Sequence, residues 1–249
     1  MFVLFYKSCI FTMTVGCIIT NGTLTPPESA WSSPKVPQLD INSLYDKFHI
    51  KLVTNDLMPN ATKIKQDGPF TWDEIKLIVS TNKLELFARS YAQTQSYLDF
   101  KKHLKGNNLS IQQYLLDHEL HWDPRELEPD HRLFSDENDV KILLNKFPYY
   151  FDKNVVHLCI WTKKSIPNDP NSPVGDISPQ TKRLIQTYID KTFKGYDLVW
   201  FRNWSALQSV RAISHIHVIV KDIDQLHLEE LLDSPGNLLN DDDYALLGE

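Results

Sequence analysis

Residues 155–162 read Val-Val-His-Leu-Cys-Ile-Trp-Thr, and residues 214–221 read Ser-His-Ile-His-Val-Ile-Val-Lys. Both stretches are rich in β-branched and aromatic side chains, which predicts two strong β-strands. A third strong strand is predicted at residues 196–203 and a shorter one at residues 140–144. Because side chains alternate across a strand, these segments also predict which residues share each face of a small sheet.

Alternation gives each strong strand one aliphatic or aromatic face and a second face with polar or basic side chains. In the strand at residues 155–162, for example, Val156, Leu158 and Ile160 share the aliphatic face. If the strands pair, their second faces combine into one concave patch. The chemically active residues expected on this second face are His157, Trp161, Trp200, Arg202, His215, His217 and Lys221.

Helix signals lie mainly before the strands. Thr71 followed by Glu74 has the pattern of a capping box, and apolar residues follow it at helical spacing. A second helix is predicted over residues 84–104, a third begins after Ser110, and a crossover helix begins after Ser178. Helices first, then strands with a crossover, predict an α+β fold with a small, mainly antiparallel sheet and helices packed on one face.

Composition divides the chain into three parts. Residues 21–40 are rich in Pro, Ser and Thr, so we expect residues 1–40 to be a disordered or leader segment. Residues 41–232 are expected to form a single α+β domain. Residues 233–249 are expected to be an acidic, flexible tail.

Charge and cysteine usage narrow the classes of partner. The net charge of −6 argues against a nucleic-acid partner, which would require a basic surface. Cys159 is the one cysteine in the body of the chain, which fits a reducing, cytoplasmic compartment. The apolar stretch Met1–Thr20 is short for a membrane span, and no membrane partner is expected. If that stretch is instead a signal peptide, the protein is secreted.

Three histidines on one sheet face suggest two kinds of chemistry. His215 and His217 can act as general base or nucleophile together with His157, while Arg202 or Lys221 holds an anion. As an alternative, His157, His215 and His217 can ligate one metal ion.

A third reading is ligand binding without chemistry. The rings of Trp161 and Trp200 can stack on a sugar or a base. A structural reading stands beside all of these, because histidines also occur on ordinary half-buried strands. In that reading Cys159 is an inert buried thiol.

Two further histidine motifs are incomplete. His118 and His121 flank a glutamate, but metalloprotease helices need histidines four residues apart. This segment is therefore interpreted as a solvated helix end. His215 and His217 resemble two of the three alternating histidines of the histidine-triad hydrolases, but position 219 is Ile.

Several short motifs, taken in order, resemble one fungal family, the N-acetylglucosamine-induced proteins, which carry a domain of unknown function. The resemblance spans roughly residues 70–222 and implies a cytoplasmic protein of the N-acetylglucosamine response with no established activity. It also draws Tyr149, beside the polar face, into the expected ligand-binding set. The motifs are Phe147-Pro148-Tyr149, Val156-His157 leading to Trp161, Trp200-Phe201-x-Asn203, Ser209-Val210 and His215-Ile216-His217-Val218.

These observations lead to two functional hypotheses. In the first, the polar face binds or processes an amino sugar or a nucleotide sugar. In the second, the chain is a non-catalytic regulatory or interaction protein whose histidines are structural. The sequence decides neither whether the protein is an enzyme nor which cofactor it uses.

Overall fold

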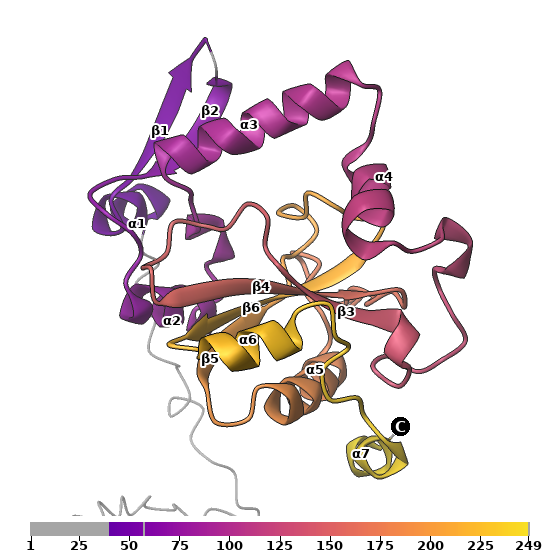
Figure 1. Ribbon diagram of the computed structural model, residues 1–249. Helices are drawn as coiled ribbons and strands as arrows, with labels where there is room; N and C mark the ends of the chain where they lie inside the picture. Colours follow the sequence, from indigo (N-terminus) through magenta and orange to yellow (C-terminus); the bar gives the residue numbers. More distant parts are fainter. Residues whose placement is uncertain (1–39, 57, 249) are drawn as a thin grey trace, which may run out of the picture. The chain divides into compact units, whose positions relative to one another are not determined.

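The expected sheet is present in the computed structural model, which describes residues 40–56 and 58–248. Within these residues, neighbouring strands of the sheet are all antiparallel, in the order β3-β4-β6-β5 (Figure 1). The predicted α+β class is therefore confirmed. The four strands are β3 (Val140–Leu144), β4 (Val155–Thr162), β5 (Asp197–Phe201) and β6 (Ser214–Lys221).

A crossover helix connects two strands that do not touch. Helix α5 (Pro179–Thr192) begins after the N-cap Ser178, whose hydroxyl accepts from the backbone of Thr181. It joins β4 to β5, and β6 inserts between them as the antiparallel partner of both. The aliphatic face of the sheet, including Leu158 and Val218, packs against α5 in the largest hydrophobic core.

The remaining helical elements lie before and after the sheet in sequence. The predicted helix over residues 84–104 is interrupted, because Ser90 caps a new helix with Gln93 in a capping box. Elsewhere the capping signals at Thr71 and Ser110 begin helices as predicted. The helices are α1 (Ile41–Lys47), α2 (Trp72–Ser80), α3 (Tyr91–Gly106), α4 (Ile111–Leu115) and α6 (Gln225–Leu231), with short turns η1 (Leu84–Leu86), η2 (Leu116–Leu120), η3 (Pro124–Glu126) and η4 (Glu137–Asp139).

A separate hairpin precedes the domain's main sheet. Its strands are β1 (Ile50–Asn55) and β2 (Met58–Lys65), paired antiparallel. The sequence did not reveal this hairpin. Most of β1 is exposed, so no clear alternation of apolar and polar residues marks it.

The expected flexible tail is instead an ordered helix, which corrects that prediction. Helix α7 (Asp241–Leu247) starts at a capping box formed by Asn240 and Asp243. The side chain of Tyr244 is fully buried, and its hydroxyl donates to the carbonyl of Leu133 at 2.6 Å. Tyr244 therefore anchors an otherwise acidic segment to the largest core, together with ion pairs from Asp241 to Arg132 and from Asp243 to Lys191. The expected leader, residues 1–40, lies almost wholly outside the described residues.

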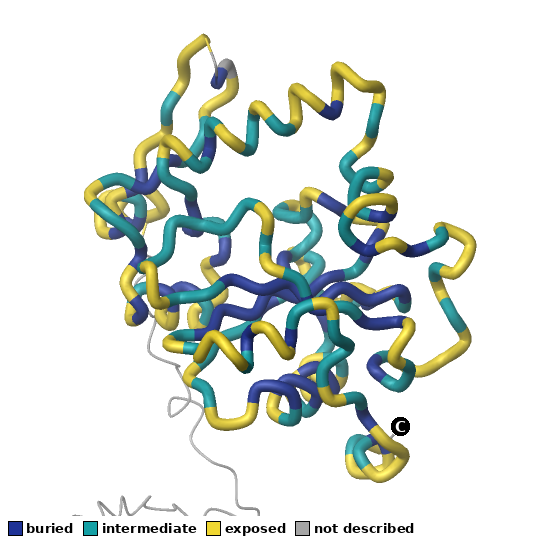
Figure 2. The backbone as a smooth tube through the Cα atoms, in the orientation of Figure 1, coloured by how far each residue is buried: buried dark blue, intermediate teal, exposed yellow. Residues whose placement is uncertain are grey.

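Both faces of the sheet are covered. Opposite α5, Phe201 and Ile219 belong to a second core with residues of α1, α2 and η1. Cys159 and Trp161 belong to a third core with residues of η2. Figure 2 accordingly shows the central strands as buried on a backbone whose outer turns are exposed. No helix within the described residues is both long enough and apolar enough to cross a bilayer.

Candidate functional site

The register of the sheet decides which predicted residues share a face. His217 lies directly between Cys159 on β4 and Phe201 on β5. Trp200 pairs with Val218 and therefore lies on the opposite face, where its ring nitrogen donates to Gln186 of α5 at 2.6 Å. The prediction that Trp200 joins the histidines is wrong. Apart from Asp197 at its start, both alternating sets of β5 are apolar or aromatic, so the sequence could not tell which one faces α5.

Two predicted cations also lie outside the site. Arg202 follows the end of β5, and its Nη1 donates to Oδ1 of Asn168 at 2.8 Å. Lys221 ends β6, and its Nζ lies 3.7 Å from a carboxylate oxygen of Asp222. Neither side chain lines the cavity described below. The expected anion-holding role therefore has no support in the position of either residue.

The three predicted histidines are close to one another, but they do not converge on one point. Nε2 of His157 lies 3.0 Å from Nδ1 of His217. Sγ of Cys159 lies 3.6 Å from the same Nδ1. His215 turns away from this group, because its Nδ1 donates to the carbonyl of Ile213 at 3.1 Å. Its ring stacks on Trp161, with 4.4 Å between ring centroids.

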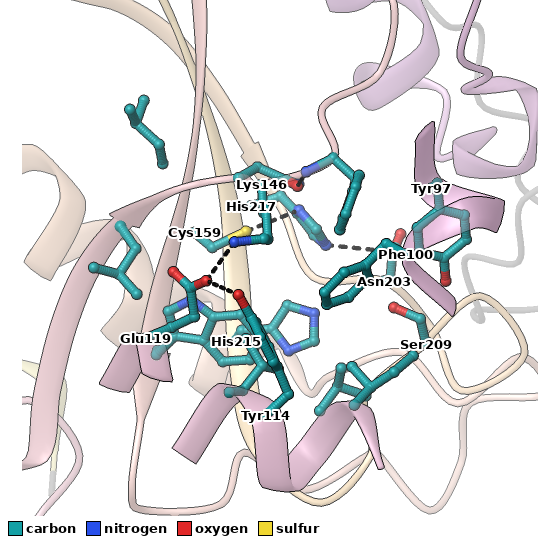
Figure 3. Close-up of a pocket in the computed structure, with 18 of the residues that line it drawn as sticks. Tyr97, Phe100, Tyr114, Glu119, Lys146, Cys159, Asn203, Ser209, His215 and His217 are labelled. Carbon is teal, nitrogen blue, oxygen red and sulfur yellow. Dashed lines mark hydrogen bonds and ion pairs between the residues drawn. The ribbon is translucent and has the colours of Figure 1, made fainter. Parts of the chain in front are cut away.

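A cavity of about 250 Å³ opens over this part of the sheet (Figure 3). Its floor includes Cys159, His215 and His217, and helices α3 and α4 with η2 supply its walls. His157 lies beneath the floor rather than at its surface. The other side chains that carry polar or aromatic groups to the cavity are Arg89, Tyr97, Phe100, Tyr114, Glu119, Asn145, Lys146, Phe147, Tyr149, Trp161, Asn203 and Ser209.

The charged groups of the cavity are already engaged. Nζ of Lys146 lies 2.6 Å from Oε1 of Glu119, which also accepts from the hydroxyl of Tyr114 at 3.1 Å. The guanidinium of Arg89 donates twice to the carbonyl of Phe147, at 2.9 and 2.8 Å. Lys146 and Glu119 therefore balance each other, whereas Arg89 keeps its charge, because its partner is a neutral carbonyl.

Burial makes the floor neutral. Desolvation lowers the pKa of His157 to about 3 and that of His215 to about 4. It also holds the pKa of His217 well below its ordinary value. The same burial raises the pKa of the Cys159 thiol to about 12. Near neutral pH the floor presents uncharged imidazoles that can accept or donate hydrogen bonds.

Residues 71–221, which include the whole floor and most of the cavity walls, match the family model described as a protein of unknown function (DUF3605). The chain belongs to the DUF3605 family. The resemblance expected from the motifs is confirmed by a relative from Candida albicans, N-acetylglucosamine-induced protein 1. That relative is 47% identical to this DUF3605 chain, over 94% of the chain and 100% of the relative.

Two further proteins are similar to this DUF3605 chain at lower identity. The uncharacterized protein YPL067C of Saccharomyces cerevisiae is 30% identical over 60% of this chain and 77% of its own length. The crystal structure of HTC1 is 26% identical, with a TM-score of 0.51. It covers 65% of this chain and 92% of the HTC1 chain.

Several cavity residues of this DUF3605 protein were missed from the sequence. Glu119 lies within the motif interpreted as a solvated helix end, and His118 and His121 are indeed exposed. Glu119 itself turns into the cavity (Figure 3). Tyr97 and Phe100, three residues apart on α3, have the spacing of an ordinary apolar helix stripe. Only the packing of α3 over the sheet distinguishes such a stripe from a cavity wall.

Proposed function

We propose that this DUF3605 protein takes part in the N-acetylglucosamine response by binding a neutral amino sugar in the cavity over the histidine face. The name of the Candida albicans relative supports the biological setting. The cavity supports the ligand class, and it is the observation that carries the proposal. A cytoplasmic location belongs to the same proposal, since the buried thiol of Cys159 suits a reducing compartment.

The size of the cavity favours a single sugar ring. Its volume of about 250 Å³ lies below the range of about 300–1,000 Å³ that is usual for drug-sized ligands. A monosaccharide suits this volume better than a nucleotide sugar does. Aromatic rings such as Tyr97 and Phe100 offer apolar surface to the faces of a sugar ring.

The polar groups favour a neutral ligand over a phosphorylated one. Glu119 can accept from sugar hydroxyls, while Lys146 is paired with Glu119 and Arg89 already donates to the carbonyl of Phe147. His215 donates through Nδ1, so its neutral ring leaves Nε2 as an acceptor. A sugar phosphate would have to compete with Glu119 for Lys146, or with the carbonyl of Phe147 for Arg89.

Calorimetric titration of the purified full chain tests this proposal. We expect binding of N-acetylglucosamine, weaker binding of glucose, and no tighter binding of N-acetylglucosamine 6-phosphate or of the UDP-sugar. Glu119→Gln and His215→Gln should each weaken binding about tenfold, as expected for the loss of about 1.4 kcal/mol of hydrogen bonding.

Trp200→Phe provides the matched control, since Trp200 lies on the far face of the sheet. Its affinity should equal that of the wild type. The proposal would be overturned if none of the four sugars gave a heat of binding in calorimetry or raised the melting temperature of the protein. Equal loss of binding in Trp200→Phe and Glu119→Gln would show that the ligand does not occupy this cavity.

A further inference from the structure

Three donor atoms that the sugar site does not require lie together at and just beneath the floor of the cavity. They are Nε2 of His157, Sγ of Cys159 and Nδ1 of His217, and all three lie within 4.8 Å of one another. All three side chains are buried. We propose that His157, Cys159 and His217 form a binding site for one zinc ion.

The distances between the donor atoms are close to those of a tetrahedral site. Zinc–nitrogen bonds of about 2.0–2.1 Å and zinc–sulfur bonds of about 2.3 Å imply donor separations of about 3.4 Å between nitrogens and about 3.6 Å between nitrogen and sulfur. The two imidazole nitrogens lie 3.0 Å apart, and Sγ lies 3.6 Å from Nδ1 of His217. The two nitrogens are therefore about 0.4 Å closer than a tetrahedral zinc site requires, so the rings must part when the ion binds.

The sheet itself holds the three residues in place. His157 and Cys159 are alternate residues of β4 on the same face, and Cys159 is the direct cross-strand partner of His217 on β6. Cys159 and His217 also line the cavity. The fourth position of the ion therefore faces the cavity, as in zinc sites that bind a water or a substrate.

The hydrogen bonds of Asn145 set His157 in the form that binds a metal. Oδ1 of Asn145 accepts from the backbone N–H of Phe147 at 2.9 Å. Its amide nitrogen consequently faces Nε2 of His157 at 3.2 Å. Nε2 must then be the unprotonated nitrogen, and the ring proton resides on Nδ1, which has no hydrogen-bond partner among the described residues. Zinc takes the Nε2 lone pair in place of the hydrogen bond from Asn145.

Asn203 can do the same for His217. Its amide nitrogen lies 3.1 Å from Nε2 of His217, and its Oδ1 is buried without a hydrogen-bond partner among the described residues. Turning the amide by half a turn places that oxygen against Nε2. Nε2 then keeps the ring proton and donates it to Oδ1, which leaves Nδ1 free to bind zinc.

This set replaces one residue of the set expected from the sequence. His215 was expected as the third ligand, but its Nδ1 donates to the carbonyl of Ile213 and its ring stacks on Trp161. Cys159 takes its place. Formation of the zinc–sulfur bond sends the thiol proton to solvent, so binding releases one proton per chain.

Cobalt and zinc titrations of the full chain test the site. The chain has two other cysteines, Cys9 and Cys17, so the variant Cys9→Ser/Cys17→Ser isolates Cys159 as the one thiol. We expect this protein to bind about one zinc per chain by elemental analysis. Cobalt should give the strong thiolate-to-metal absorption of a tetrahedral site, and zinc should abolish it.

Substitutions then distinguish the zinc ligands from the residues that orient those ligands by hydrogen bonds. Adding Cys159→Ser should remove the thiolate absorption, and His217→Gln should weaken zinc binding more than tenfold. Asn203 is not a zinc ligand, so Asn203→Ala should weaken zinc binding by about 10–100-fold while the thiolate absorption remains. Circular dichroism of each variant separates loss of the site from loss of the fold.

His131→Gln is the control, because His131 lies with Asp136 and Asp139 in a second, more exposed group of candidate ligands. It should bind zinc like the wild type. The proposal is overturned if the Cys9→Ser/Cys17→Ser protein binds no zinc, or if His131→Gln abolishes binding. None of these readouts contains a sugar, so the zinc site and the proposed sugar site succeed or fail separately.

Discussion

His217 shows how much one residue depends on its surroundings. Its Nδ1 faces His157 and Cys159, its Nε2 faces Asn203, and its ring stacks on Phe201 with 4.9 Å between centroids. These partners come from β4, β5 and the segment after β5. The sequence predicted that His217 lies on the functional face, but none of these contacts follows from its position in the chain.

A glycine near the C-terminus gives a stability prediction at the same scale. Gly236 has a φ of +64°, and a Cβ there would lie 2.6 Å from the hydroxyl of Tyr188 and 2.7 Å from Cγ2 of Thr192. That hydroxyl donates to the carbonyl of Pro235 at 2.6 Å. We expect Gly236→Ala to lower the free energy of unfolding by about 1–3 kcal/mol in urea titrations.

Gly106 offers the comparison within the same chain. It ends α3, and a Cβ there would meet no neighbouring atom. We expect Gly106→Ala to be neutral or to stabilise the protein by about 0.4–1 kcal/mol. If both variants lost a similar free energy of unfolding, the positive φ and the close contacts at Gly236 would not be the cause of the loss.

At the scale of elements, capping signals were more reliable than apolar patterns. Thr71, Ser110 and Ser178 each begin a helix as their sequences predict, because a side-chain oxygen accepts from a free backbone N–H within the same turn. Such bonds are local and can be recognised in the sequence. Helix α7 has an equally clear cap at Asn240, but its acidic composition suggested a frayed tail.

The anchoring of α7 can be measured by two substitutions. We expect Tyr244→Ala to lower the free energy of unfolding by about 3–5 kcal/mol, because it empties a fully buried aromatic site. Leu246 is 89% exposed, so Leu246→Ala should change stability by no more than about 0.5 kcal/mol. If urea titrations give equal midpoints for both, α7 contributes nothing to the fold.

At the scale of the whole molecule, the sheet separates unlike cores. The aliphatic face packs against α5, α6 and α7 in one core. The histidine face meets an aromatic core beside α2 and a smaller core beside η2. The cavity lies over the histidine face, and residues of α3 and α4 form walls of the cavity (Figure 3).

This organisation predicts that the functional unit begins near residue 41. Ile41–Glu249 forms one compact unit. A chain that starts at Ile41 should therefore unfold at the same temperature as the full chain and keep the same sugar affinity. A lower midpoint, measured by circular dichroism, would show that the first 40 residues stabilise the fold.

The sequence by itself determined the α+β class, the four strands of the main sheet, the helix starts after Thr71, Ser110 and Ser178, and the family. These properties rest on alternation, capping and motif order, which act between residues close in the chain. The tertiary structure alone decided that Trp200 leaves the histidine face, that Cys159 replaces His215 beside His157 and His217, and that Glu119 lines a cavity. Strand order, register and the packing of α3 and α4 set these contacts, and they join residues far apart in sequence whose local patterns carry no record of the partner.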